Sequence, residues 1–239
     1  MGTELLVVDQ TTYPILADSG NVGQTILDNM GGEAISPADL VRIKIPSSGA
    51  TTWLVPTADG EQPMKTLDGV IVHICRRRAM WDGADPTGKP PLCCSNDMIR
   101  GVGNPGGECE HCKWNQYGTS VKQDGSPANG KKCKETKLVF LLRPGQFLPD
   151  VVGISPGSLK DFRKWQLSLK VPYWAISVSL SLKEDRNTDG IKYAKVVPTQ
   201  TSILNKDVAE VIAAYAKQMA GVFEATSMTP EETGGSVEI

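Results

Sequence analysis

Four cysteines in the middle of the chain have the type and spacing of zinc ligands. Cys109 and Cys112 are separated by two residues, and a C-x2-C turn of this kind delivers two thiolates to one metal ion. Cys93 lies fifteen intervening residues before this pair, and Cys133 lies twenty after it. Because zinc favours four such ligands in a tetrahedron, we predict one structural Zn²⁺ bound by these four cysteines.

Spacing alone leaves the ligand set partly open. Cys94 could replace its neighbour Cys93, whereas His111 lies too close to both cysteines of the C-x2-C turn to ligate with them. His111 is expected either to face solvent or to contact a ligand without binding the metal. Cys75 and His73 fall within an apolar run and are typical of buried core residues. Four cysteine ligands leave no open coordination position, so the predicted role of the metal is structural and not catalytic.

The segment around these cysteines needs an ordering element. Residues 82–134 are crowded with Gly, Pro, Asn and Cys and show no helical period. A segment of this length is too long for a featureless loop in a compact domain. A bound metal can order such a segment without a hydrophobic core. We therefore predict a zinc-binding insertion at about residues 82–135.

Basic and aromatic residues are concentrated near this insertion. Lysine and arginine neutralise phosphates, and exposed aromatic rings stack on bases, which contributes roughly 1–3 kcal/mol per base. Core positions for Trp81 and Tyr193, and a solvated face for the lysine run that continues to Lys137, are the alternative interpretations. The candidate nucleic-acid-binding residues are Arg76, Arg77, Arg78, Trp81, Trp114, Tyr117, Lys131, Lys132, Lys134, Tyr173, Lys183, Tyr193 and Lys195.

The charge distribution favours a polyanion ligand. The net charge is only −2, but residues 1–69 hold 3 basic against 9 acidic residues, residues 70–195 hold 20 against 12, and residues 196–239 hold 2 against 6. A basic middle with acidic ends is typical of a polyanion-binding body with an acidic tail. An ordinary surface with unevenly distributed charge is the alternative.

Periodicity predicts the elements that would position these residues. Predicted strands cover 40–45, 51–55, 69–81, 136–143, 173–183 and 191–197, and predicted helices cover 157–170 and a stretch that begins after Asn205. Five long strands with a helix between the third and fourth follow the order of an oligonucleotide-binding (OB) barrel.

The predicted fold is therefore β-rich (α+β). It comprises an OB-fold-like five-stranded barrel with an inserted zinc-ribbon-like loop and a C-terminal helix. We divide the chain into an extended segment at 1–37, the OB-like domain at 38–223 and a flexible acidic tail at 224–239. In that tail Glu231, Glu232 and Glu238, with Val237 and Ile239, could recruit a replication or recombination protein.

Composition and missing motifs weigh against other classes. Of the 239 residues, 40% are hydrophobic and 22% charged, which permits a sizeable core. No apolar run approaches the ~20 residues of a membrane span, and the first residues do not resemble a secretory signal, so we expect a cytoplasmic protein. The chain holds only 2 histidines, and Gly101–Gly106 matches G-x-G-x-x-G outside a strand–helix context, so we expect no enzymatic activity.

Between residues 67 and 200 the chain contains, in order, LDGVIVHICRRRAMW, PPLCCSND, GGECEHCKWNQYGTS, KKCKETKLVFLLRPG and PGSLKDFRKWQLSL. In this order the motifs resemble a group of bacteriophage-encoded, zinc-containing OB-fold-like proteins associated with replication and single-stranded-DNA binding. In that group the first cysteine follows Pro-Pro-x, which implies Cys93 and not Cys94 as the ligand. The resemblance also implies a location in the host-cell cytoplasm.

The leading hypothesis is a non-enzymatic single-stranded-DNA-binding protein of phage replication or recombination. A zinc-ribbon module that binds a host protein, such as a transcription-regulatory factor, is the second hypothesis, because it needs the metal but no DNA groove. A divalent-metal nuclease is the third, although no acidic cluster indicates one.

Overall fold

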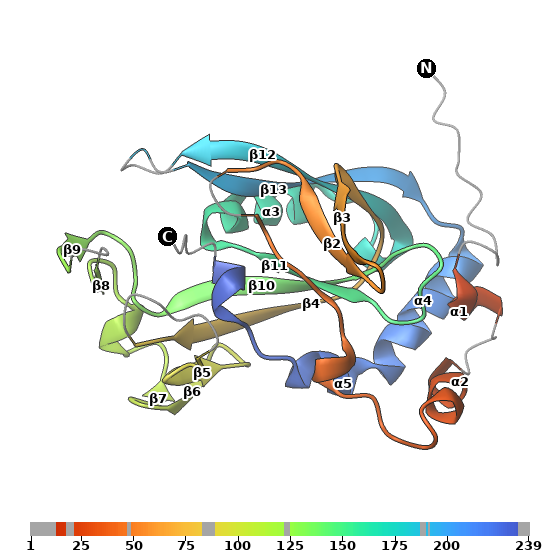
Figure 1. The fold of residues 1–239 in the computed structure, drawn as a ribbon, viewed down its shortest axis with the longest axis horizontal. Helices are drawn as coiled ribbons and strands as arrows, with labels where there is room; N and C mark the ends of the chain where they lie inside the picture. The colour runs from red at the N-terminus through yellow and green to blue at the C-terminus, as the bar shows by residue number, and fades with distance from the viewer. Residues whose placement is uncertain are drawn as a thin grey trace.

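One long strand, β4 (Thr66–Met80), organises the chain in the computed structural model (Figure 1). The structure describes residues 13–17, 22–46, 49–82, 89–121, 125–186, 190 and 192–233. Among these residues nine strands form one mixed sheet, and two further hairpins lie beside it. The described part of the chain contains no helix that is both long and apolar enough to cross a bilayer.

The strands fall into one large sheet and two hairpins. The sheet contains β4 with β1 (Arg42–Ile43), β5 (Cys93–Ser95), β6 (Arg100–Gly103), β7 (Gly107–Glu108), β10 (Lys134–Leu142), β11 (Asp150–Ile154), β12 (Ile176–Arg186) and β13 (Lys192–Ile203). The hairpins are β2 (Trp53–Thr57) with β3 (Gly60–Met64), and β8 (Ser120–Val121) with β9 (Pro127–Ala128).

Helices lie mainly at the two ends of the described chain. The α-helices are α1 (Pro14–Ala17), α2 (Val22–Asn29), α3 (Pro156–Ser168), α4 (Lys206–Gln218) and α5 (Ala220–Ala225). Short 3₁₀ turns are η1 (Pro37–Asp39), η2 (Lys113–Asn115), η3 (Tyr173–Ala175) and η4 (Pro230–Thr233).

Strand pairing makes β4 the common partner of the body and the insertion. Strand β10 pairs with β4 along one edge, and β12 and then β5 pair with it along the other. Strand β11 pairs antiparallel with β10 and parallel with β1, while β13 pairs with β12. The insertion, β5 to β9, therefore projects from the end of β4 that lies away from α1, α2 and α4 (Figure 1).

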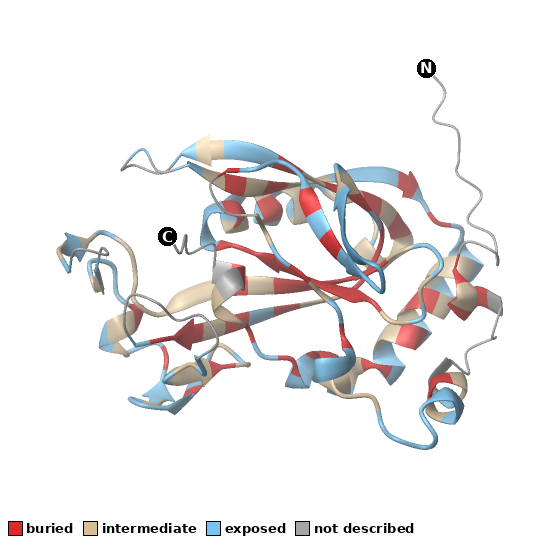
Figure 2. Ribbon diagram, viewed as in Figure 1, coloured by how far each residue is buried: buried red, intermediate tan, exposed pale blue. Residues whose placement is uncertain are grey.

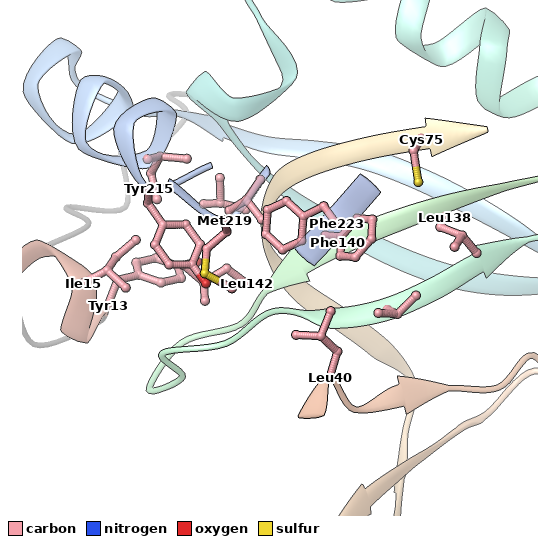
Figure 3. Close-up of a cluster of buried hydrophobic side chains, with 14 of the residues drawn as sticks. Tyr13, Ile15, Leu40, Cys75, Leu138, Phe140, Leu142, Tyr215, Met219 and Phe223 are labelled. Carbon is pink, nitrogen blue, oxygen red and sulfur yellow. The ribbon is translucent and has the colours of Figure 1, made fainter. Parts of the chain in front are cut away.

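Two hydrophobic clusters cover the two faces of this sheet. In one, Tyr13 of the chain start, Phe140 of β10 and Phe223 of α5 pack together under α1, α4 and α5 (Figure 3). In the other, Trp53 of β2 and Phe162 of α3 cover the opposite face. The predicted alternation of β12 is confirmed because its apolar residues are buried: Ile176, Val178, Leu180 and Leu182.

The β-rich class is confirmed, but the described strands do not close into a five-stranded barrel. Strand β13 pairs only with β12, and β11 pairs with β10 and β1. Strand β11 was not predicted because all five of its residues are buried, so it has no polar alternation (Figure 2). The predicted strand at 40–45 is reduced to Arg42–Ile43.

Helix starts were predicted with mixed success. The side chain of Asn205 accepts a hydrogen bond from the Val208 amide at 2.8 Å, which confirms the predicted N-cap of α4. The helix predicted at 157–170 begins one residue earlier, at Pro156 of α3. Its Ser158 does not cap the helix, because the Ser158 hydroxyl accepts a hydrogen bond from the Val196 amide of β13.

The predictions for both chain ends need correction. The segment at 1–37 is not simply extended, because Tyr13 and Ile15 enter the core and α1 and α2 follow. Residues 224–233 of the predicted flexible tail are not free, because α5 extends to Ala225 and η4 packs on β10 and β11. The side chain of Glu232 is only 4% exposed and accepts a hydrogen bond from Arg42, so it is not available to a partner. Residues 1–12 and 234–239 lie outside the described residues.

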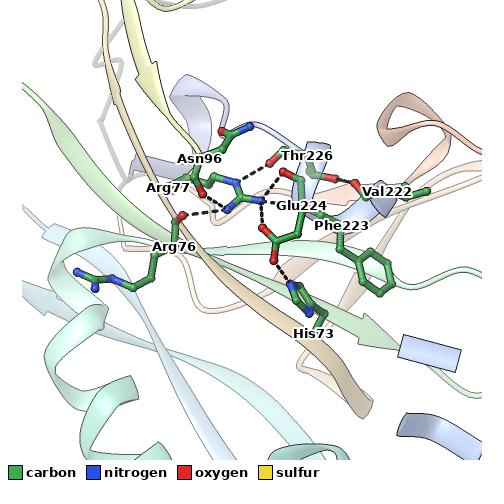
Figure 4. Close-up of polar contacts among 8 residues, drawn as sticks. All are labelled: His73, Arg76, Arg77, Asn96, Val222, Phe223, Glu224 and Thr226. Atoms are coloured by element: carbon green, nitrogen blue, oxygen red, sulfur yellow. Dashed lines mark hydrogen bonds and ion pairs between the residues drawn. The ribbon is translucent and has the colours of Figure 1, made fainter. Parts of the chain in front are cut away.

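The C-terminal segment is held on β4 by the buried guanidinium of Arg77 (Figure 4). Its nitrogens donate to the carbonyls of Thr226 at 2.8 Å, Phe223 at 3.0 Å and Glu224 at 3.0 Å. A further nitrogen donates to the Asn96 carbonyl of the insertion at 2.6 Å. One side chain thus joins the central strand, the insertion and the chain end.

We predict that Arg77→Met lowers the free energy of unfolding by roughly 3–5 kcal/mol, because it leaves buried carbonyls without donors. Arg76→Met is the matched control, and loss of its more exposed ion pair should cost under about 1 kcal/mol. Urea denaturation of both variants measures the difference. Equal stabilities would contradict the role given to Arg77.

Candidate metal centre and nucleic-acid interface

The insertion brings the four predicted zinc ligands into one neighbourhood. Cys93 begins β5, Cys109 and Cys112 lie between β7 and η2, and Cys133 directly precedes β10. Burial raises the pKa of the Cys133 thiol, Arg78 lowers it, and the nearby Cys109, Cys112 and Cys93 raise it, so that the pKa is about 11. Each of the three is therefore close enough to Cys133 to act on its charge.

Strand geometry separates Cys93 from Cys94. Successive side chains of a strand point to opposite faces, and Cys94 packs against the hydrophobic cluster beneath α4 and α5. The sulfur of Cys93 lies over Gly101 of β6, where an added Cβ would approach it to 2.8 Å. A side chain at position 101 would therefore displace the Cys93 sulfur, and the alternation of the strand places Cys93 on the face away from Cys94.

Arg78 gives a second observation that bears on a metal. Its Nε is buried and has no hydrogen-bond partner among the described residues, although its positive charge is near enough to lower the pKa of the Cys133 thiol. A metal-bound thiolate at Cys133 would supply the negative partner that this donor lacks. The donor set of four cysteines, with a cation beside it, fits Zn²⁺.

The side chains themselves are not yet gathered around one point. Within the described residues no group of three or more His, Cys, Asp or Glu side chains is arranged to hold a metal ion. Burial keeps the Cys133 thiol protonated at neutral pH by raising its pKa, and a Zn²⁺ ion bound there would displace that proton. His111 is exposed, as predicted, and lies 4.0 Å from Glu108.

Two aromatic rings beside the cysteines carry lysines over their faces. Tyr117 is 80% exposed, and the Lys131 ammonium lies 4.9 Å from the centre of its ring. The half-buried Trp114 has Lys113 at 4.6 Å and Lys132 at 4.8 Å from its ring centre. We call Trp114, Tyr117 and these three lysines the aromatic platform. An exposed aromatic ring such as that of Tyr117 can stack on a base, and the ammonium groups beside it can bind a phosphate.

Backbone contacts tie the platform to the cysteines. The buried Asn115 donates from its side-chain amide to the Cys109 carbonyl at 2.8 Å and accepts from the Lys131 ammonium at 3.2 Å. The Cys133 amide donates to the Trp114 carbonyl at 2.9 Å. The positions of both rings therefore depend on the chain around Cys109 and Cys133.

Several predicted nucleic-acid residues do not fit an interface. Arg77 is 1% exposed and fully engaged, as described above, because α5 covers that face of β4. Trp81 is buried, and its ring nitrogen donates to the Lys89 carbonyl at 3.1 Å. Tyr173 lies in η3 and not in a strand, and it packs edge-on against Trp174.

The residues predicted on β12 and β13 are largely paired with acids. Lys195 bridges Asp161 of α3 and Asp185 of β12, and the Tyr193 hydroxyl donates to Asp185 at 3.1 Å. Lys183 lies opposite Lys195 in the hairpin, as predicted, and is exposed. Since the acids compensate Lys195, this hairpin contributes little net positive charge to a groove.

The predicted nucleic-acid-binding residues nearest the insertion are partly exposed or half-buried. Arg76 is 51% exposed and Arg78 is mostly covered, and both bind Glu135. Lys134 is half-buried, and burial lowers its pKa.

Two further basic residues near these candidates, Lys113 and Arg163, were not predicted from the sequence. The first directly follows Cys112, which could have indicated it, whereas the second comes from α3 and is brought near β10 only by the tertiary fold. Gly101–Gly106 connects β6 to β7 and precedes no helix, as expected from the rejected motif.

In comparisons with known proteins, no family model, no curated protein and no solved structure matches this chain.

We predict that Cys75 is the least reactive cysteine of the metal-stripped chain. Burial raises its thiol pKa to about 12, so at pH 8 the reactive thiolate is on the order of one part in ten thousand. Alkylation with iodoacetamide followed by peptide mass spectrometry should modify the more exposed Cys112 first. Equal labelling rates at the two positions would contradict the burial of Cys75.

Proposed function

We propose that this chain is a non-enzymatic single-stranded-DNA-binding protein, acting in phage replication or recombination as its motif resemblance implies. The observation that carries the proposal is the aromatic platform, in which the exposed Tyr117 and the half-buried Trp114 lie beside three ammonium groups. Duplex bases are already stacked on one another, whereas unpaired bases can stack on such rings. The platform therefore favours single strands.

The strand order is compatible with an OB-like architecture. Strand β4 pairs with β10 and β12, the next strands β11 and β13 extend the sheet on each side, and α3 lies between β11 and β12. An OB-fold is a partly open five-stranded barrel whose loops bind single strands. In this comparison the cysteine-rich insertion occupies the loop between the first and second barrel strands, which is one of the loops that bind oligonucleotides.

We further propose that Cys93, Cys109, Cys112 and Cys133 hold one structural Zn²⁺. When bound, the ion supplies the ordering energy that a segment with few buried apolar residues lacks. Among the described residues of the insertion, the buried ones are few: Ser95, Gly101, Cys109 and Asn115. Four cysteines leave no site for a reacting water, so the ion has no catalytic part.

A protein-binding zinc module remains the second candidate. It is favoured by the exposed apolar side chains of Ile99 and Val102, which are 71% and 72% exposed on and beside β6. Such a module would bind a host protein and show no affinity for DNA. The DNA titration below separates the two candidates.

We predict one zinc per chain and its loss in Cys112→Ser, since three thiolates bind zinc less tightly than four. Amide exchange should rise across residues 89–121 while β12 and β13 stay protected. Cys94→Ser is the matched control and should retain zinc, because Cys94 points into the hydrophobic cluster. Plasma emission spectroscopy gives the stoichiometry, and a full zinc complement in Cys112→Ser would contradict the assignment.

We predict that Tyr117→Ala weakens binding of fluorescein-labelled oligo-dT by about 5- to 150-fold, which corresponds to one lost base stack. Phe147→Ala, which removes a partly exposed aromatic ring between β10 and β11, should bind as the unaltered chain does. Fluorescence anisotropy at several salt concentrations measures both. Undetectable or salt-insensitive binding by the unaltered chain would overturn the proposed function.

A further inference from the structure

One face of β4 changes from apolar to basic along its length. Ile74 packs into the cluster under α3, and the next residues on that face are Arg76 and Arg78. In the register with β10, Arg76 lies opposite Lys137 and Arg78 lies opposite Glu135. Figure 4 shows Arg76 and Arg77 extending away from each other, so Arg76 lies on the face that the C-terminal segment does not cover.

Helix α3 adds positive charge to this face. The Lys137 ammonium donates to Gln166 of α3 and lies 5.5 Å from the ring centre of Phe162. Burial lowers the pKa of Lys137, and the nearby charges of Arg76 and Arg163 lower this pKa further. The cations are therefore close enough to repel one another, and a bound anion would relieve that repulsion.

A single carboxylate holds the two arginines in place. Glu135 accepts from Arg76 at 2.7 and 3.1 Å through one oxygen and from Arg78 at 3.3 Å through the other. A phosphate presents the same kind of acceptor to arginine. Two arginines share this one acid and Lys137 lies nearby, so the face keeps an excess of positive charge.

These cations lead directly to the aromatic platform. Arg78 pairs in register with Glu135 of β10, two residues after Cys133, and Lys131 and Lys132 of the platform directly precede Cys133 in the chain. Asp82, 3.9 Å from Lys132, is the acid paired with this end.

Resting on the proposed function, we infer that Arg76, Arg78, Lys137 and Arg163 form a phosphate track that continues the platform. The backbone of a bound single strand runs from the platform across β4 and β10 to α3. Glu135 occupies the track in the free protein as an internal substitute for phosphate. The DNA strand therefore crosses the face of the sheet that α4 and α5 do not cover. On the covered face, Arg77 is buried and donates to carbonyls of Thr226 and Phe223.

Salt dependence of oligo-dT binding tests the track. Each lost phosphate contact should reduce the slope of log affinity against log salt by about 0.7, which is about a 2.6-fold change in the ratio of affinities at 50 and 200 mM salt. Arg76→Ala and Arg163→Ala should each show this loss. Lys206→Ala removes a side chain that is 86% exposed on α4, and its slope should stay that of the unaltered chain.

The Glu135→Gln variant should change oligo-dT binding in the opposite direction to the arginine variants. Removing the internal acid frees both arginines, so the affinity should rise and the slope should steepen by about 0.7 or more. Unfolding cannot produce a gain of affinity, which keeps this arm informative. Unchanged or weaker binding by Glu135→Gln would overturn the substitute role of Glu135.

The outcomes separate the track from the function it rests on. If the unaltered chain does not bind oligo-dT, both fail. If it binds and Tyr117→Ala weakens it, but Arg76→Ala and Arg163→Ala keep the full slope, the proposed function stands and the track is wrong. Reduced slopes in both arginine variants, with no change in Lys206→Ala, support the track.

Discussion

The buried guanidinium of Arg77 is the interaction on which the arrangement of the chain depends. A charged group in the interior is costly unless every donor has an acceptor, and its donors are met mainly by carbonyls from Asn96 and from residues 223–226. These acceptors come from the insertion and from the end of the chain. The side chain can therefore be buried only when both segments are docked on β4. Glu224 strengthens the arrangement because it approaches Arg77 at 3.3 Å and His73 at 3.0 Å.

This constraint assigns different roles to the two faces of β4. On one face Cys75 and Arg77 are covered by α5 and the segment after it, and the stacking of Phe223 on His73 closes the surface further. On the other face Arg76 and Arg78 stay accessible in part, beside Cys93 of the next strand. Because neighbouring residues of a strand point in opposite directions, a single basic run supplies both a structural anchor and a candidate binding surface.

The sequence predicted what depends on local pattern and missed what depends on distant packing. The alternation of β12 and the Asn205 cap were foreseeable because a few adjacent residues determine each. Nothing local distinguishes Arg77 from Arg76, since the segment that buries Arg77 lies about 150 residues further along. Strand β11 and the helix α1 were missed for a related reason: their residues are buried by partners from elsewhere and lack an exposed face to set a period. Spacing left Cys93 and Cys94 open as ligands and the resemblance implied Cys93, whereas the register of β5 on β4 shows the two as neighbouring strand residues that point to opposite faces.

The candidate metal centre and the aromatic platform share the same short stretches of chain. Asn115 and Trp114 bond to the backbone at Cys109 and Cys133, so any ligand that fixes those cysteines also fixes the rings. If a metal ion orders this stretch, DNA binding no longer bears the entropy cost of ordering it. By linkage, bound DNA raises the affinity for the metal by the same factor. Arg78 interacts with residues on both sides: its charge lowers the pKa of the Cys133 thiol, and its guanidinium binds Glu135. Arg78 is thus the cation shared by the proposed metal site and the proposed phosphate track, and a change of charge at the cysteines would alter its interaction with Glu135.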